Sequence, residues 1–141
     1  MRSQGLLPST IAIVINQRLL LKSRMSEDIY VRLAKSSFRS RFHLSKKDQD
    51  YVRDKGLDVI RRHAKEFVQK RLSPPVSQLK NDGKQTPMRG HPVFVAQHAC
   101  ACCCRQCLLK WHGIDTNHWL TDSEQLYIVE FLINWIKKEM I

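Results

Sequence analysis

The chain has 141 residues, a length that suits one domain built around a single hydrophobic core. Hydrophobic residues make up 43% of it and charged residues 26%, a composition that excludes a disordered or fibrous protein. No apolar run approaches the roughly 18 residues that a membrane span needs. The net charge of +11 favours an acidic partner, such as nucleic acid.

The first 24 residues differ from the rest of the chain. They carry four basic and no acidic side chains, and they include a short apolar stretch at residues 11–15. The stretch is too short for a signal peptide, and the segment is too poor in serine for an organelle transit peptide. Because Met25-Ser26-Glu27-Asp28 resembles a natural start, we expect residues 1–24 to be a non-core N-terminal extension. Residues 25–141 are then the helical domain.

The first two predicted helices of this domain flank a glycine. Ser45 and Asp48 resemble a capping box, which predicts a helix over residues 46–55 that ends at Gly56. A second helix, over residues 57–72, is the clearest amphipathic segment of the chain. The two prolines that follow end it, since proline cannot continue the hydrogen-bond ladder.

Two further helices are predicted after a long loop. Residues 73–92 form the loop, with four prolines and two glycines, and the third helix is expected over residues 93–111. Thr121-Asp122-Ser123-Glu124 is a full capping box, which opens a last helix that reaches about residue 140. Its predicted core stripe comprises Leu126, Val129, Ile133 and Ile136. The fold class expected is therefore all-α, a small single-domain bundle of about four helices with one long loop before the third.

The cysteines indicate the compartment. All five lie within eight positions, at 100, 102, 103, 104 and 107. A secreted disulfide scaffold spaces its cysteines so that they tie distant segments together, which these neighbours cannot do. We therefore expect a reducing compartment and a cytoplasmic protein.

The same segment suggests a metal site. On the predicted third helix, Cys100, Cys103, Cys104 and Cys107 share one face. Thiolates prefer zinc, iron or cuprous ions, and four-coordinate sites of mixed cysteine and histidine are common. Cys107 with either Cys103 or Cys104 offers two ligands, which predicts zinc or an iron–sulfur cluster. The histidines that complete the site if the chain folds back are His91, His98 and His112.

Two other interpretations of the cysteines stay open. Buried cysteine behaves as a small hydrophobic residue, so the stripe could be plain, closely packed core. Cys104 and Cys107 also have the two-residue gap of a redox dithiol. An active dithiol occupies a helix N-terminus, whereas these two lie in the middle or later half of the predicted helix, which disfavours redox chemistry.

The basic residues suggest a function as a binding module. Residues 25–72 carry thirteen basic against seven acidic side chains. The candidates for contact with nucleic acid or another acidic partner are Arg39, Arg41, Lys46, Lys47, Arg61, Arg62, Lys84 and Arg89. Because acids are interleaved among them, an ordinary solvated helix face explains the same charges. The alternatives are a metal-dependent enzyme with its site between the 73–92 loop and the third helix, or a structural protein with buried cysteines.

Three blocks of the chain resemble a small bacterial family catalogued only as a domain of unknown function. They are FRSRF at residues 38–42, then NDGKQTPMRGHPVF, then QHACACCCRQCLLKWHGI. The resemblance covers roughly the last hundred residues, leaves residues 1–24 outside, and implies a bacterial cytoplasmic protein. It also implies that threonine often replaces Cys100 and Cys102 in similar members. The ligand set then narrows to Cys103, Cys104 and Cys107 with a histidine from His91, His98 and His112. The family implies no activity.

Overall fold

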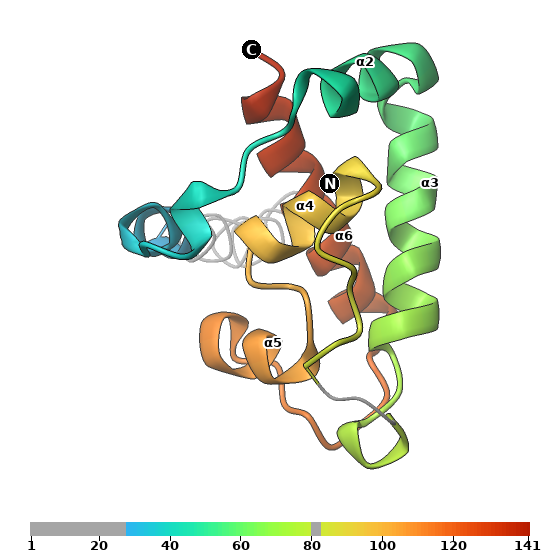
Figure 1. Ribbon diagram of the computed structural model, residues 1–141. Helices are drawn as coiled ribbons and strands as arrows, with labels where there is room; N and C mark the ends of the chain where they lie inside the picture. Colours follow the sequence, from blue (N-terminus) through green and yellow to red (C-terminus); the bar gives the residue numbers. More distant parts are fainter. Residues whose placement is uncertain (1–27, 80–82) are drawn as a thin grey trace, which may run out of the picture.

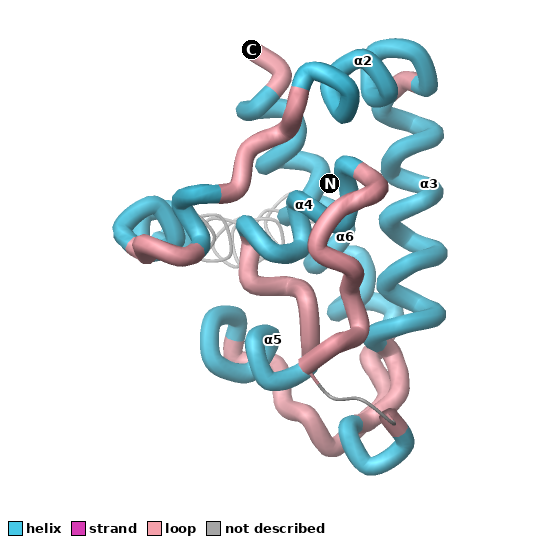
Figure 2. Tube along the Cα trace, in the orientation of Figure 1, coloured by secondary structure: helices cyan, strands magenta, loops and turns pink. Residues whose placement is uncertain are grey.

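The structure is a computed structural model that describes residues 28–79 and 83–141. The predicted N-terminal extension, residues 1–24, lies outside the described residues. The described chain consists of helices joined by loops and contains no strand, so the all-α prediction is confirmed (Figure 2). None of its helices combines the length and the apolar character needed to cross a membrane.

The described residues contain six α-helices rather than about four. Residues 28–35 form a helix that the sequence pattern did not suggest. The others, with the short helices between them, are η2 (Arg39–Arg41), α2 (Lys46–Lys55), α3 (Leu57–Phe67), η3 (Val68–Leu72), η4 (Val76–Gln78), α4 (Pro92–Ala99), α5 (Arg105–His112) and α6 (Asp122–Glu139). Figure 1 shows α2 and α5 toward opposite ends of the molecule.

The caps of α2 are those that the sequence predicts. The Asp48 N–H donates to Oγ of Ser45 at 3.1 Å, which satisfies one of the amides left free at the helix start. At the other end Gly56 has a φ of +85°, a left-handed conformation that glycine adopts without steric cost. This glycine lets α3 start directly after α2 in a new direction (Figure 1).

The second predicted helix, over residues 57–72, is also confirmed, with one local difference. Its last turn, η3, is a π-helix in which the Ser73 N–H donates to the Val68 carbonyl, five residues back, at 3.1 Å. The apolar face of α3 and η3 is buried at Ile60, Ala64, Val68 and Leu72. This face packs against α6.

Helix α6 is the central helix, as its wide apolar surface predicts. Its capping box is formed, with the Glu124 N–H donating to the Thr121 Oγ1 and the Glu124 carboxylate accepting from the Thr121 N–H. It packs on α3, η3 and α4. One residue of the predicted stripe is wrong: Leu126 is 59% exposed and lines an open surface pocket with Arg61 and Lys65 of α3. The buried positions are Ile128, Val129, Phe131, Leu132, Ile133 and Ile136.

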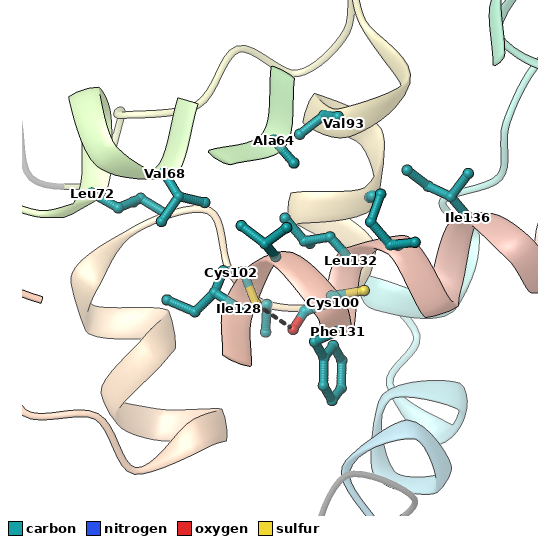
Figure 3. Packing of buried hydrophobic residues seen from close by; sticks show 14 of the residues in the cluster. Ala64, Val68, Leu72, Val93, Cys100, Cys102, Ile128, Phe131, Leu132 and Ile136 are labelled. Carbon is teal, nitrogen blue, oxygen red and sulfur yellow. Dashed lines mark hydrogen bonds between the residues drawn. The ribbon is translucent and has the colours of Figure 1, made fainter. Parts of the chain in front are cut away.

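Helix α4 is buried on every side. All eight of its residues are buried, because it lies between α6 and the α2–α3 pair. Val93 meets the core cluster near Ala64 of α3 and Leu132 of α6 (Figure 3). The predicted long loop leads into this helix, and its described residues include one short 3-10 helix, η4.

The prediction of one continuous third helix is wrong. Helix α4 ends at Ala99 and α5 starts at Arg105, with a break between them. The four cysteines expected on one helix face therefore do not share one. Cys100 is the C-cap residue of α4, whereas Cys107 lies in the first turn of α5.

The break is a Schellman-type helix stop that uses alanine. Ala101 has a φ of +57°, in the left-handed region. The Cys102 N–H donates to the Gln97 carbonyl at 2.8 Å, and the Ala101 N–H donates to the His98 carbonyl at 3.4 Å. Glycine usually occupies the left-handed position, since a Cβ there costs about 1–2 kcal/mol. An alanine at this position gives no sign of a helix end in the sequence.

Candidate metal centre

The break sorts the five cysteines into two groups. Cys100 and Cys102 are fully buried and face the hydrophobic core, near Ile128 and Phe131 of α6 (Figure 3). The Cys102 thiol donates to the Cys100 carbonyl at 3.5 Å. For these two cysteines, the interpretation as closely packed core describes what the structure shows.

The other three thiols form a cluster outside that core. The Sγ atoms of Cys103, Cys104 and Cys107 all lie within 4.8 Å of one another. The Sγ atoms of Cys104 and Cys107 are 3.3 Å apart, and those of Cys103 and Cys107 are 3.6 Å apart. Cys103 and Cys104 are buried, at 8% and 5% exposure, whereas Cys107 is partly exposed. This cluster could hold a metal ion.

Two structural features hold the cluster in place. Cys104 is the N-cap of α5, and its Sγ accepts from the Cys107 N–H at 3.4 Å. The carbonyl of Cys103 accepts from the Thr86 Oγ1 at 2.8 Å, which ties it to the end of the long loop. The Gln97 side chain joins the same network, donating to the Thr86 Oγ1 at 3.2 Å and to the Cys102 carbonyl at 3.1 Å.

An arginine from a distant part of the chain sits against the thiols. The Arg39 Nη2 donates to the Cys107 Sγ at 3.1 Å, and its Nη1 lies 3.6 Å from the Cys103 Sγ. The same Nη1 donates to the His98 carbonyl at 2.7 Å, which fixes the guanidinium relative to α4. Arg39 belongs to η2, so η2 and the start of α5 form the site together.

These contacts assign the negative charge of the metal-free cluster to Cys107. Hydrogen bonds from the thiols of Cys103 and Cys104, and then the Arg39 guanidinium, hold the pKa of Cys107 well below its usual range. The pKa of Cys103 is raised, because its thiol proton is held in hydrogen bonds to its two sulfur neighbours and because it is buried. These contacts therefore favour the thiolate form of Cys107 over those of Cys103 and Cys104.

The three predicted histidine ligands are not in this cluster, and each has other partners. The Nε2 of His98 lies 3.1 Å from the Pro87 carbonyl and 3.2 Å from the Thr86 carbonyl, so it carries a proton and donates to the loop. Burial lowers the pKa of His98. Its ring stacks on Phe42, with the ring centroids 5.5 Å apart.

His112 lies on the core side of α5. Its Nε2 donates to the Cys100 carbonyl at 2.8 Å and lies 3.4 Å from the Cys102 Sγ, and its Nδ1 is 2.9 Å from the Tyr127 hydroxyl. Burial lowers the pKa of His112. These contacts attach the end of α5 to α6.

His91 caps α4. Its Nδ1 accepts from the Val93 N–H at 3.0 Å, so its Nε2 carries the proton and donates to the Nδ1 of His63 at 3.0 Å. Burial and then the neighbouring His63 lower the pKa of His91 to about 4. A neutral His91 is what this capping geometry requires.

Comparison with known families adds one match. A family model described as Domain of unknown function (DUF4186) matches residues 27–137. The chain belongs to this family. No solved structure matches the chain.

The family match includes the whole candidate site. Arg39 and the three clustered cysteines all lie within the matched residues of this DUF4186 domain. The resemblance that the three sequence blocks suggested is confirmed at the level of the family. Residues 1–26 lie outside the match.

One premise about the cysteines of the DUF4186 domain needs correction. Cys104 and Cys107 were expected in the middle or later half of a helix, too far from its N-terminus for thiolate chemistry. Because α5 begins at Arg105, Cys104 is the N-cap and Cys107 is the third residue of the helix. The two-residue gap therefore lies where the helix dipole stabilises a thiolate.

Sequence reasoning assigned the arginine that contacts the thiols to another role. Arg39 was a nucleic-acid candidate, and only the three-dimensional fold brings it to Cys107. Arg105 lies between Cys104 and Cys107 in sequence, yet it is fully buried and donates to the carbonyls of Leu72, Ser73, Pro74 and Asp115. Arg105 therefore supports the fold beneath the site.

The other basic candidates lie on several elements of the fold. Arg61 donates to both carboxylate oxygens of Glu130, at 2.8 and 3.2 Å, and lies 3.7 Å from Asp58. The exposed ones are spread over η2, α2, α3 and the long loop: Arg41, Lys46, Lys47, Arg62, Lys84 and Arg89. A nucleic-acid or other acidic partner stays a prediction.

Proposed function

We propose that this protein binds one zinc ion through the thiolates of Cys103, Cys104 and Cys107. The observation that carries the proposal is the convergence of three sulfur atoms within 4.8 Å at the start of α5. The proposal keeps the three predicted cysteine ligands and leaves out the predicted histidines.

The spacing of the sulfurs fits a mononuclear zinc site. A zinc–sulfur bond of about 2.3 Å places tetrahedral thiolates about 3.8 Å apart. The distances of 3.3 and 3.6 Å from Cys107 to its neighbours, and the upper limit of 4.8 Å, lie on either side of that value. Small side-chain rotations therefore suffice to place an ion at equal distance from all three.

The charge of the site also fits. Three thiolates and one Zn²⁺ carry a net charge of −1, and the Arg39 guanidinium 3.1 Å from Cys107 neutralises it. In the metal-free state the same arginine stabilises the one thiolate that is already present. A partly buried site keeps these interactions strong, because less water screens them.

The geometry favours a single ion over an iron–sulfur cluster. Such clusters are usually held by four cysteines spread around several iron atoms. Here three thiols lie close together, while Cys100 and Cys102 face the core with α6. Three protein ligands leave a fourth position for water or another external ligand. That position also suits catalysis, and the metal-dependent enzyme stays a prediction.

A titration of the reduced, metal-free full chain tests the proposal. Zinc added against a chromogenic chelator should bind with a stoichiometry of one, and Co²⁺ should give the thiolate charge-transfer and tetrahedral ligand-field bands. Cys107→Ser should abolish both signals, whereas Cys100→Ala, which removes a core thiol, should leave them. Binding that survives Cys107→Ser, or no binding by the folded wild type, would refute the proposal.

A further inference from the structure

The start of α5 has the arrangement of a dithiol that reacts with disulfides. Cys104 directly precedes the helix and Cys107 lies in its first turn, with their Sγ atoms 3.3 Å apart. A sulfur–sulfur bond is about 2.05 Å long, so side-chain rotations of modest size would close one. The free amides and the dipole at a helix N-terminus stabilise negative charge on a sulfur placed there.

The surroundings give the two sulfurs different roles. Cys107 is partly exposed and receives the Arg39 Nη2 at 3.1 Å, so it is the accessible sulfur and it lies beside a fixed positive charge. Cys104 is 5% exposed, so an external molecule reaches it poorly. Cys107 is therefore suited to attack an external disulfide. Cys104 is suited to attack the resulting mixed disulfide from inside the protein.

We propose that Cys107 and Cys104 form a thiol–disulfide exchange pair. The Cys107 thiolate attacks one sulfur of an external disulfide, forms a mixed disulfide with it, and expels the other sulfur as a thiolate. Cys104 then loses its proton to solvent and attacks the Cys107 sulfur, which closes the Cys104–Cys107 bond and expels the second thiolate. Starting from the Cys107 thiolate, the protein loses two electrons and the one proton of Cys104, and the external disulfide becomes one thiolate and one thiol.

Oxidation of this pair also controls the metal site, a consequence that rests on the proposed zinc binding. A closed Cys104–Cys107 disulfide leaves Cys103 as the one free thiol of the cluster, and a single thiol does not retain zinc. Conversely, bound zinc occupies the attacking sulfur and protects it from disulfides. The site is then a redox switch in which zinc binding and disulfide formation exclude each other.

The experiment uses the full chain, reduced and metal-free, with oxidised glutathione as the probe. The remaining thiols are then alkylated in denaturant, and the peptides are mapped by mass spectrometry. We expect a Cys104–Cys107 disulfide and alkyl groups on Cys100, Cys102 and Cys103. Zinc-loaded protein should form this disulfide at least about tenfold more slowly. Mapping of the wild type does not depend on whether any variant folds.

Variants assign the order of attack. Cys104→Ser should accumulate a glutathione adduct on Cys107, because the second step is blocked. Cys107→Ser should give neither adduct nor disulfide. The matched control, Cys100→Ala, should react like the wild type. An adduct on Cys104 in the Cys107→Ser variant, or a Cys103–Cys107 disulfide in the wild type, would overturn the assignment.

The two proposals fail in different ways. If the folded, metal-free chain keeps all five thiols under oxidising glutathione, exchange is refuted, whether or not zinc binds. If the disulfide forms but the reduced chain takes up no zinc, exchange stands, and zinc binding and the switch are refuted together.

Discussion

The guanidinium of Arg39 lies 3.1 Å from the sulfur of Cys107, although 68 residues separate the two in sequence. This contact joins η2 to α5 and places a fixed positive charge beside the thiol cluster. Together with the hydrogen bonds from the Cys103 and Cys104 thiols, which are the larger causes, it lowers the pKa of Cys107.

The first prediction concerns this contact. Arg39→Met removes a charge-assisted hydrogen bond and should raise the pKa of Cys107, because thiolate stabilisation is lost. After allowance for solvent screening, we expect the pH profile of Cys107 alkylation in the metal-free chain to move up by about 1 pH unit. The matched control is Arg41→Met, which removes an exposed arginine of the same short helix. An unchanged profile in Arg39→Met would contradict the role given to Arg39.

The second prediction concerns proton release. The lowered pKa of Cys107 predicts that it is the thiolate of the metal-free site, with Cys103 and Cys104 carrying the protons that they donate to it. Zinc binding at pH 7 should therefore release two protons per ion rather than three. Calorimetric titrations in buffers of different ionisation enthalpy measure this number. In Arg39→Met the number of protons released per zinc ion should rise toward three. Release of three protons by the wild type would contradict a thiolate at Cys107 in the metal-free site.

The third prediction concerns Ala101. Its φ of +57° is strained for alanine and free of cost for glycine. Ala101→Gly relieves this strain, but it also removes a fully buried methyl group and gives the unfolded chain more freedom, so it should change the free energy of unfolding by less than about 0.5 kcal/mol. Ala96→Gly, inside α4, should lower it by about 1 kcal/mol or more. Both alanines are fully buried, so urea unfolding of the two variants isolates the conformational effect, and a loss in Ala101→Gly as large as that in Ala96→Gly would argue against the left-handed helix stop.

The fourth prediction concerns Arg105. Arg105→Met removes a donor from four buried or partly buried carbonyls, of which that of Ser73 keeps the Leu120 N–H, so it should lower the free energy of unfolding by about 3 kcal/mol. Arg62→Met, on an exposed position of α3, should change it by no more than about 0.5 kcal/mol. Urea unfolding of both variants provides the test, and similar values for the two would show that the carbonyl contacts of Arg105 contribute little.

The fifth prediction concerns acid. The pKa of His91 is about 4 in the folded chain and about 6.5 when unfolded, so between these values the unfolded chain binds a proton that the folded chain does not. Stability should therefore fall as the pH drops from about 6.5 toward 4. The lowered pKa values of His98 and His112 act in the same direction.

Replacement of His91 isolates its share of this effect. His91→Asn keeps a side chain that can cap α4 but cannot bind the proton. The variant should lose part of the decline in the free energy of unfolding between pH 6.5 and 4, measured by urea unfolding at several pH values. A pH dependence as steep as that of the wild type would exclude His91 as a contributor.

Much of the fold could be predicted because its signals are local. Each of these signals acts within a few residues: the caps at Ser45 and Thr121, the glycine at position 56, and the apolar periodicity of residues 57–72. The break after Ala99 could not be predicted, because the residue in the left-handed conformation is Ala101, and alanine ordinarily favours a helix. That one conformation changes which cysteines share a face.

The candidate site could be predicted only in part for the same reason. Cysteine spacing offered Cys107 with either Cys103 or Cys104, and the family resemblance narrowed the ligand set to these three. The single helix on which they were placed is in fact two helices with a break between them. The partner that sets their charge, Arg39, lies far away in sequence and carries no motif of its own. His98 and His112 have the chemistry of ligands, but their contacts with carbonyls and with Tyr127 depend on tertiary structure.

X-ray absorption at the zinc edge of the loaded full chain tests the proposed coordination most directly. We expect three sulfur neighbours at about 2.3 Å and one oxygen or nitrogen neighbour in the fourth position. A shell with two sulfurs and two imidazole nitrogens, or with no sulfur at all, would contradict a site built from Cys103, Cys104 and Cys107.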